Sequence, residues 1–179
     1  SLSLALSHAI LVCLTERPMS GYDLAKFFDT SIGFFWSATH PQIYRQLKKL
    51  QEEGLVTSAE EVQTGKPNRF VYSITDTGKA ALKAWSREPV SQPLIKDDLL
   101  VRLQAIDHID RDAMREQIEA RLDAQREQLG QYHHIREVRF AGQVLDQDLG
   151  KLMGLELGIQ YEEGWIRWCE NVLARLGAV

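Results

Sequence analysis

Residues 39–56 read Thr-His-Pro-Gln-Ile-Tyr-Arg-Gln-Leu-Lys-Lys-Leu-Gln-Glu-Glu-Gly-Leu-Val, and they predict one short amphipathic helix. Thr39 can cap its start by accepting hydrogen bonds from free backbone N–H groups, and Pro41 suits the first turn. Apolar side chains recur at helical spacing and form one stripe, which consists of Ile43, Leu47 and Leu50. Gly54 suits the left-handed residue that ends a helix.

The face opposite this stripe is polar and basic. Its side chains can donate hydrogen bonds to phosphates and base edges, and they are Gln42, Arg45, Lys48 and Lys49. An ordinary solvated surface helix shows the same pattern, so this stretch alone leaves both interpretations open. The segments on either side of it decide between them.

Two further helices are predicted before this one. The apolar pattern of residues 3–16 gives the first, which the Arg17-Pro18 pair ends. Ser20 can cap the second helix with its hydroxyl group. The loop at residues 31–38 contains three consecutive aromatic side chains, which we expect to be buried or at an interface because exposed aromatic clusters promote aggregation. They are Phe34, Phe35 and Trp36.

A two-stranded hairpin is predicted after the basic helix. Its first strand begins at residues 55–57, and its second spans residues 70–74 with alternating apolar side chains. The turn between them, residues 64–69, reads Thr-Gly-Lys-Pro-Asn-Arg and carries two cations. Thr75 then caps a helix that continues to about Arg87.

Three helices followed by a strand, a basic turn and a strand predict a winged helix-turn-helix with a two-stranded wing. In this fold the third helix, residues 39–53, enters the major groove, and the wing, residues 64–69, lies on the DNA backbone. The predicted DNA contacts from these two segments are Thr39, His40, Gln42, Arg45, Lys48, Lys49, Lys66, Asn68 and Arg69.

The composition fits a globular protein without a membrane span. Hydrophobic residues make up 44% of the 179, and no apolar run reaches the roughly 18 residues that cross a bilayer. Residues 1–88 contain ten Lys and Arg against nine Asp and Glu, a net charge of +1. Residues 89–179 contain eleven against sixteen, a net charge of −5, so the first half can still present a basic face.

The two cysteines, Cys13 and Cys169, are far apart, and each lies in an apolar helical pattern. This favours buried free thiols in a reducing cytoplasm over a disulfide or a metal site. We therefore expect a cytoplasmic protein with no metal and no cofactor.

The second half, residues 89–179, predicts a mainly helical domain. A short helix at 94–106 precedes a long helix at 111–140, capped by Asp110, and a returning helix at 144–176. Narrow apolar stripes on both long helices are typical of a coiled-coil seam, so we predict a dimerisation arm. The predicted interface residues are Met114, Ile118, Leu122, Leu129, Tyr132, Ile159, Ile166 and Leu173.

Several motifs occur in a fixed order in the first half. They are Ile10-Leu11, Pro18, Gly-Tyr-Asp-Leu at 21–24, Gln-Ile-Tyr-Arg-Gln-Leu-Lys-Lys-Leu at 42–50, Glu-Gly-Leu-Val at 53–56, Gly-Lys-Pro-Asn-Arg at 65–69, Tyr-Ser-Ile-Thr at 72–75 and Gly78. Through them, residues 8–85 resemble the PadR family of bacterial transcriptional regulators. The segment Trp-Ser-Ala-Thr-His at 36–40 is most similar to the subgroup with a long helical C-terminal domain, which includes virulence-gene activators.

The resemblance implies a homodimer on double-stranded DNA with a two-fold symmetric operator, often acting as a repressor. It also implies phosphate contacts from Tyr22 and Tyr44, although core residues with exposed hydroxyl groups would show the same pattern. Because members of the family often respond to small molecules, a small aromatic effector is a candidate partner. The candidate lining residues are Trp36, Tyr161, Trp165 and Trp168. Packing in the dimer core is the favoured alternative for the last three.

Gly150, Gly154 and Gly158 form a strip at a spacing of four, for which we expect close helix–helix approach. An enzyme is disfavoured because the sequence has no Ser/His/Asp cluster, no glycine-rich phosphate loop after a strand and no HExxH motif. A winged-helix protein-interaction module with a coiled-coil arm remains the alternative to a DNA-binding regulator. The basic helix and wing favour DNA.

Overall fold

The protein is mainly helical with a small antiparallel sheet, as the sequence predicts. The structure is a computed structural model that describes residues 2–177, and its contacts divide the chain into two compact units, Ser1–Pro93 and Leu94–Val179. The domain boundary predicted from the sequence lies between residues 88 and 89. Residues 1, 178 and 179, at the outer ends of the two predicted domains, lie outside the described residues.

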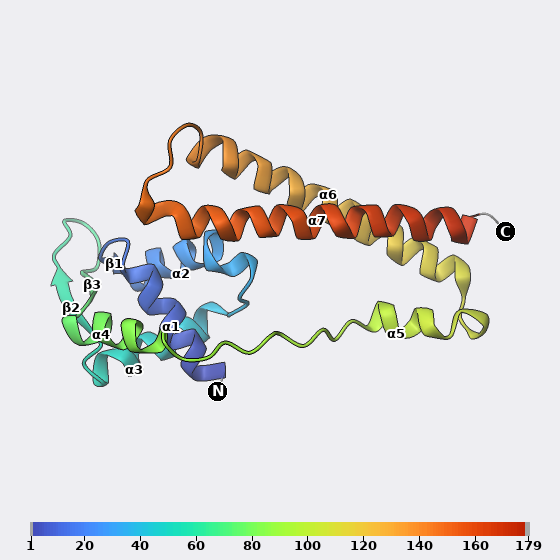
Figure 1. Cartoon of the computed structure of the whole chain (residues 1–179). Coiled ribbons are helices and arrows are strands. Elements are labelled where there is room, and N and C mark those ends of the chain that lie inside the picture. Colours follow the sequence, from blue (N-terminus) through green and yellow to red (C-terminus); the bar gives the residue numbers. More distant parts are fainter. Residues whose placement is uncertain (1, 178–179) are drawn as a thin grey trace. The chain divides into compact units, whose positions relative to one another are not determined.

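The first unit has the element order of a winged helix-turn-helix (Figure 1). Its elements are α1 (Leu2–Leu14), β1 (Met19–Ser20), α2 (Gly21–Thr30), the 3-10 turn η1 (Ile32–Phe34), α3 (His40–Glu52), β2 (Val56–Glu61), β3 (Arg69–Ile74) and α4 (Asp76–Trp85). The strands pair antiparallel in the order β1-β3-β2. The third strand, β1, was missed because a two-residue strand is too short to show an alternating pattern.

Side-chain caps fix the starts of three helices, and all three were predicted. Ser20 Oγ accepts a hydrogen bond from the Asp23 backbone N–H, and Thr75 Oγ1 accepts one from the Gly78 backbone N–H. Thr39 caps α3. Gly54 follows α3 with a φ of +77°, which confirms the left-handed residue expected there.

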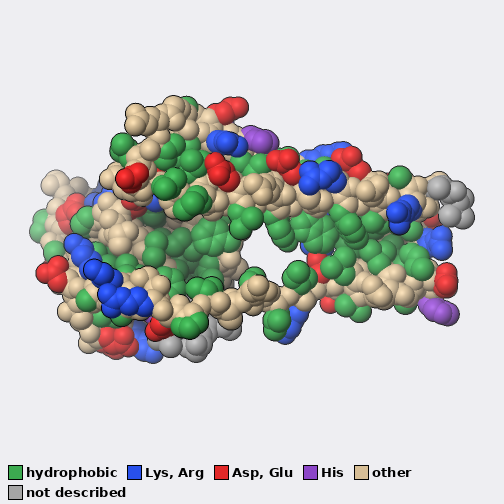
Figure 2. All heavy atoms as spheres, in the orientation of Figure 1, with side chains coloured by type: hydrophobic (Ala, Val, Ile, Leu, Met, Phe, Trp, Pro, Cys, Tyr) green, Lys and Arg blue, Asp and Glu red, His purple; other side chains and the backbone are tan. Residues whose placement is uncertain are grey.

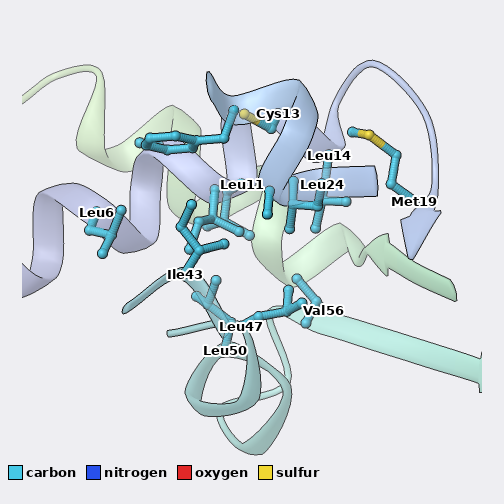
Figure 3. Close-up of a cluster of buried hydrophobic side chains, with 14 residues drawn as sticks. Leu6, Leu11, Cys13, Leu14, Met19, Leu24, Ile43, Leu47, Leu50 and Val56 are labelled. Carbon is cyan, nitrogen blue, oxygen red and sulfur yellow. The ribbon is translucent and has the colours of Figure 1, made fainter. Parts of the chain in front are cut away.

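The core of the first unit is built from α1, α2, α3 and the start of β2, as the labelled side chains of Figure 3 show. The predicted stripe of α3, Ile43, Leu47 and Leu50, is at most 2% exposed. Each of these side chains stabilises the fold by roughly 1.5–3 kcal/mol through removal from water. Burial of this stripe turns the opposite, basic face of α3 outward.

The first unit departs from the prediction at one helix end, and its aromatic loop is only partly buried. The first helix ends at Leu14 and not at Glu16. Within the aromatic loop, Trp36 packs against the core, but Phe35 is 74% exposed and so is not buried within this chain. Phe70 on β3 is also exposed, while Tyr72 packs against the core.

The second unit consists of three helices and two short turns. Its elements are α5 (Asp98–Gln104), η2 (Ile106–His108), α6 (Arg111–Arg139), η3 (Asp146–Asp148) and α7 (Leu149–Gly177). The two long helices lie side by side (Figure 1), and hydrophobic side chains gather between α5 and this pair (Figure 2). Asp110 caps α6 as predicted. By contrast, α5 starts at residue 98 and α7 at residue 149, each later than predicted.

The predicted dimer seam is used inside one chain. The side chains of Met114, Ile118, Leu122, Tyr132 and Ile159 are at least 94% buried by the single chain's own packing. The other three predicted interface residues, Leu129, Ile166 and Leu173, are half-buried. The apolar stripes therefore pair α6 with α7. Dimerisation stays a prediction, and it requires contact surface other than these stripes.

The middle of the α6–α7 seam is polar. The seam positions of α7 alternate at spacings of three and four: Leu152, Leu155, Ile159, Glu162, Ile166, Cys169, Leu173 and Leu176. Glu162 occupies one of them at 6% exposure, and burial raises the pKa of its carboxyl group. Its Oε2 has no hydrogen-bond partner among the described residues, and neither has Nε2 of Gln128 on α6.

A charged pair joins the three helices of this unit. The Arg121 guanidinium on α6 donates two hydrogen bonds to the Asp97 carboxylate, at 3.1 and 2.7 Å. It also lies 4.1 Å from the centre of the Trp165 ring on α7. Asp97 in turn caps α5 through the Leu99 backbone N–H, and the hydrogen bond from Arg121 lowers the pKa of the Asp97 carboxyl.

The glycine strip at residues 150, 154 and 158 shows only in part the close helix–helix approach that we expect of it. A Cβ atom at Gly158 would lie 3.0 Å from the Tyr132 ring, so this glycine does permit close helix approach. At Gly150 and Gly154 no described atom lies within 4 Å of such a Cβ atom. Close approach therefore explains one glycine of the three.

Both cysteines are free and buried, as predicted. Burial raises the pKa of the Cys13 thiol to about 11, and it also raises the pKa of the Cys169 thiol.

Candidate nucleic-acid interface

The outward face of α3 carries three cations. Arg45, Lys48 and Lys49 are exposed, and none of them forms an ion pair with the residues that the structure describes. The face is held in place from behind by the buried stripe of the same helix. Long cationic side chains without partners retain their full hydrogen-bonding capacity for an external anion.

The start of α3 is held by a capping box. The Gln42 backbone N–H donates to Thr39 Oγ1 at 3.3 Å, and the Thr39 backbone N–H donates to Gln42 Oε1 at 2.9 Å. The capping box uses the hydroxyl group of Thr39, whereas it uses only the oxygen of the Gln42 side-chain amide. Both residues were predicted DNA contacts, and the structure gives Thr39 a structural task as well.

His40, the first residue of α3, is paired with an acid on α2. Its Nε2 lies 2.6 Å from Asp29 Oδ2, and its ring lies edge-on to Tyr44 with centroids 6.4 Å apart. This pair joins the ends of α2 and α3, so His40 also has an intramolecular partner. This pairing was not predictable from the sequence, because Asp29 and His40 lie eleven positions apart across a loop.

The wing contains one unpaired cation and one neutralised cation. Lys66 is exposed at the tip and has no ion pair with the described residues. Arg69, at the base, lies 3.4 Å from Asp23 Oδ2 and 3.2 Å from Glu61 Oε1. Asn68 donates to Glu60 Oε1 at 3.0 Å and accepts from the Gln63 backbone N–H. Of the predicted wing contacts, Lys66 is therefore freer to reach DNA than Asn68 and Arg69, which are engaged by neighbouring residues.

A groove of about 510 Å³ separates the start of α2 from the wing. It is lined by Ser20, Gly21, Tyr22, Asp23, Gln63, Lys66, Arg69, Phe70 and Tyr72. Tyr22 is 63% exposed, so its ring belongs to the surface and not to the core. Tyr44 is half exposed and packs beside Gly21, at the other side of the α2 start.

The candidate ligand-lining residues fall into both units. Trp36 packs against the core of the first unit, whereas Trp165 and Trp168 pack against the core of the second. Trp165 makes edge contacts with both Tyr161 and Trp168, at centroid distances of 6.4 and 5.2 Å. Only Tyr161 of this trio is largely exposed.

Within residues 2–177 we find no cluster of three or more His, Cys, Asp or Glu side chains arranged to hold a metal ion. None of the described helices combines the length and apolar character that a bilayer span requires.

Comparison with protein families assigns both halves of the chain. Residues 10–84 match the transcriptional regulator PadR-like family, and residues 95–177 match the virulence activator alpha C-terminal family. A probable transcriptional regulator of Mycobacterium tuberculosis is 37% identical over 97% of this chain and 98% of its own length.

Two solved proteins share the fold over nearly the whole chain. Bacillus subtilis PadR, a negative transcriptional regulator, superposes in its complex with operator DNA with a TM-score of 0.84 at 30% identity, covering 96% of this chain and 99% of PadR. Its complex with p-coumaric acid gives a TM-score of 0.77 at 29% identity, covering 96% and 98%. The Vibrio cholerae virulence activator AphA gives 0.79 at 34% identity, covering 97% and 98%.

Proposed function

Because the chain belongs to the PadR-like family of transcriptional regulators, we propose that it binds a two-fold symmetric operator as a homodimer and represses transcription. In this proposal residues 1–88 bind DNA and residues 89–179 dimerise. The repressor role is supported by the similarity to the negative regulator PadR of Bacillus subtilis. The observation that carries the DNA-binding face is the row of exposed cations on α3, which form no ion pair within the part of the chain that the structure describes.

The geometry supports insertion of α3 into the major groove. Gln42 and Arg45 lie in the first half of the helix, which in this fold faces the base edges. Lys48 and Lys49 follow on the same outward side, where phosphates can pair with them. Lys66 on the wing would contact the backbone, with Tyr22 and Tyr44 at the α2 side of the same surface.

The dimer would use surface that one chain leaves exposed. Along α7, four large apolar side chains at a spacing of four are between 46% and 68% exposed: Leu149, Met153, Leu157 and Tyr161. A second copy could cover this row, which lies on the side of α7 away from the seam positions Ile166 and Leu173. Two DNA-binding units held in this way would match the two half-sites of the operator.

The proposal extends to a small aromatic effector. The Bacillus relative has been solved with p-coumaric acid, and this chain offers the aromatic trio Tyr161, Trp165 and Trp168 in its second unit. Binding of p-coumaric acid should quench tryptophan fluorescence in a saturable manner and weaken operator binding. Unchanged fluorescence and DNA affinity at saturating acid would remove this compound from the proposal.

Loss of single cations should separate base reading from backbone binding. Arg45→Ala should weaken operator binding by about 10- to 100-fold and relax the preference at one base pair, because a base contact is worth roughly 1–3 kcal/mol. Lys66→Ala should weaken binding uniformly across sequences and lower the slope of log affinity against log salt by about 1. Fluorescence anisotropy with DNA from the gene's own promoter region measures both.

A useful control is Lys151→Ala, a cation on α7 of the second unit, which should leave affinity and salt slope unchanged. If neither Arg45→Ala nor Lys66→Ala alters DNA binding, the assigned face is wrong.

A further inference from the structure

The base of the wing contains a four-residue polar network centred on one guanidinium group. Arg69 opens β3 and lies directly opposite Glu61, the last residue of β2. Its Nη2 donates to both Glu61 oxygens at 3.2 and 3.3 Å, and its Nη1 donates to Asp23 Oδ2 at 3.4 Å. With the Gln63 amide turned so that its NH2 group donates to Pro67 O, the Gln63 oxygen accepts from Arg69 Nε at 3.3 Å.

These contacts join two elements that are far apart in sequence. Asp23 lies in the first turn of α2, and 46 positions separate it from Arg69 on the wing. Glu61 and Gln63 lie on the other arm of the hairpin. The guanidinium therefore ties both arms of the wing to the helix-turn-helix, across the groove that Tyr22 and Lys66 also line.

The charges also argue against a phosphate contact by this residue. Two carboxylates flank a single guanidinium, so the local charge at the wing base is negative even with Arg69 present. A phosphate at this point would meet that excess and would have to displace charge-assisted hydrogen bonds. Lys66 at the wing tip has no such competitor among the described residues.

We propose that Arg69 is a positioning residue, which braces the wing against α2 through Asp23 and leaves the backbone contact to Lys66. This assignment rests on the proposed DNA-binding function and replaces the phosphate contact that the sequence predicts for Arg69. A braced wing is ordered before DNA arrives, so less conformational entropy is lost on binding. Removal of the brace should therefore weaken binding without removing a phosphate contact.

The two possible roles of Arg69, a phosphate contact and a brace, predict opposite changes in DNA affinity for Asp23→Asn. If Arg69 contacts phosphate, Asp23→Asn should strengthen DNA binding because it removes a nearby negative charge. If Arg69 braces the wing, Asp23→Asn and Arg69→Gln should each weaken binding by about fivefold, the upper range for a half-exposed ion pair. The double variant should be no weaker than either single variant, because both changes break the same contact.

The conservative variant Arg69→Lys gives a second test. An ammonium group can bind a phosphate, so a phosphate contact should survive this change with most of its affinity. It offers one nitrogen in place of the three separate nitrogens that donate to Asp23, Glu61 and Gln63, so a brace should fail as in Arg69→Gln. The salt slope should stay at the wild-type value in every variant of Asp23 and Arg69.

The experiment measures the fluorescence anisotropy of labelled operator DNA at several salt concentrations for these variants and for Lys66→Ala. The control is Asp76→Asn, which alters a first-turn acid on α4 and should leave DNA affinity unchanged. Thermal unfolding of each variant checks that the first unit is folded. Tighter binding by Asp23→Asn, or a slope lowered by about 1 in Arg69→Gln, overturns the brace while leaving the proposed function intact. Absence of wild-type binding overturns the proposed function and the brace with it, whereas no effect of Lys66→Ala overturns the assignment of the backbone contact to Lys66 and leaves the proposed function intact.

Discussion

Replacement of Gly78 by alanine should destabilise the first unit by about 3 kcal/mol, the upper range for forcing an extra carbon into a packed site. A Cβ atom at this position would lie 2.3 Å from the Leu55 carbonyl oxygen and 2.7 Å from Ile74 Cγ1. Real Cβ atoms do not approach other heavy atoms so closely. Because α4 is helical here, alanine would otherwise be favoured over glycine.

The Leu55 carbonyl cannot move aside without further loss. Its oxygen accepts hydrogen bonds from the Thr75 backbone N–H at 3.1 Å and from Thr75 Oγ1 at 3.0 Å. Thr75 Oγ1 also accepts from the Gly78 backbone N–H and thereby caps α4. A shift of Leu55 would break the contact between the end of α3 and the start of α4, close to the helix proposed to enter the major groove.

Urea unfolding followed by circular dichroism measures the loss, together with operator binding at rising temperature. The matched control is Gly130→Ala in α6, where no described atom lies within 4 Å of the added carbon. That change should stabilise the protein by up to about 1 kcal/mol through helix propensity alone. Equal effects of the two substitutions would show that the contact at Gly78 is not restrictive.

The second large effect is a gain in stability. Glu162→Leu should stabilise the second unit by about 2 kcal/mol at neutral pH, since replacement of buried charged groups by apolar ones commonly gains 1–4 kcal/mol. Glu162 is 6% exposed at a seam position of α7, and its Oε2 lacks a hydrogen-bond partner among the described residues. Leucine suits the neighbouring seam residues Ile159 and Ile166.

The gain should depend on pH. Burial raises the folded-state pKa of Glu162 above its ordinary value of 4.5. Below pH 4.5 the carboxyl is protonated in both the folded and unfolded states, so wild-type stability carries no charge penalty. Between pH 4.5 and the higher folded-state pKa only the unfolded state ionises, so the penalty grows with pH in this window and is complete above the folded pKa. The advantage of leucine should therefore shrink in acid.

Thermal unfolding at pH 7 and pH 4, at one fixed protein concentration, measures the difference. Glu170→Leu is the control, because Glu170 lies on the same helix, is 54% exposed and, among residues 2–177, pairs with the exposed Arg126 alone. That substitution should change stability by less than about 0.5 kcal/mol. A destabilised Glu162→Leu protein would instead show that the carboxylate has a partner that one chain does not contain.

Local features of the sequence predicted local structure well. Ser20, Thr39, Thr75 and Asp110 each cap a helix because capping depends on residues within three positions of one another. The stripe on α3 follows from helical periodicity alone. Gly54 was predictable because few other residues adopt a positive φ without strain.

Features that depend on distant partners were not predictable. The pairing of Arg69 with Asp23, and of His40 with Asp29, gives two of the predicted DNA contacts an intramolecular partner. A single sequence shows the charge of these side chains but not which neighbour folding brings to them. In the same way, the coiled-coil pattern indicated a seam but not whether its second helix comes from the same chain.

The buried cysteines have a practical consequence for the chemistry of this protein. With a pKa near 11, Cys13 is thiolate in only about one molecule in ten thousand at neutral pH, and Cys169 is shifted in the same direction. Oxidants and alkylating reagents act on thiolates, so the folded protein resists both. A cysteine introduced at the wing tip would then be the one reactive thiol among the described residues, available for a fluorophore or a cross-linker.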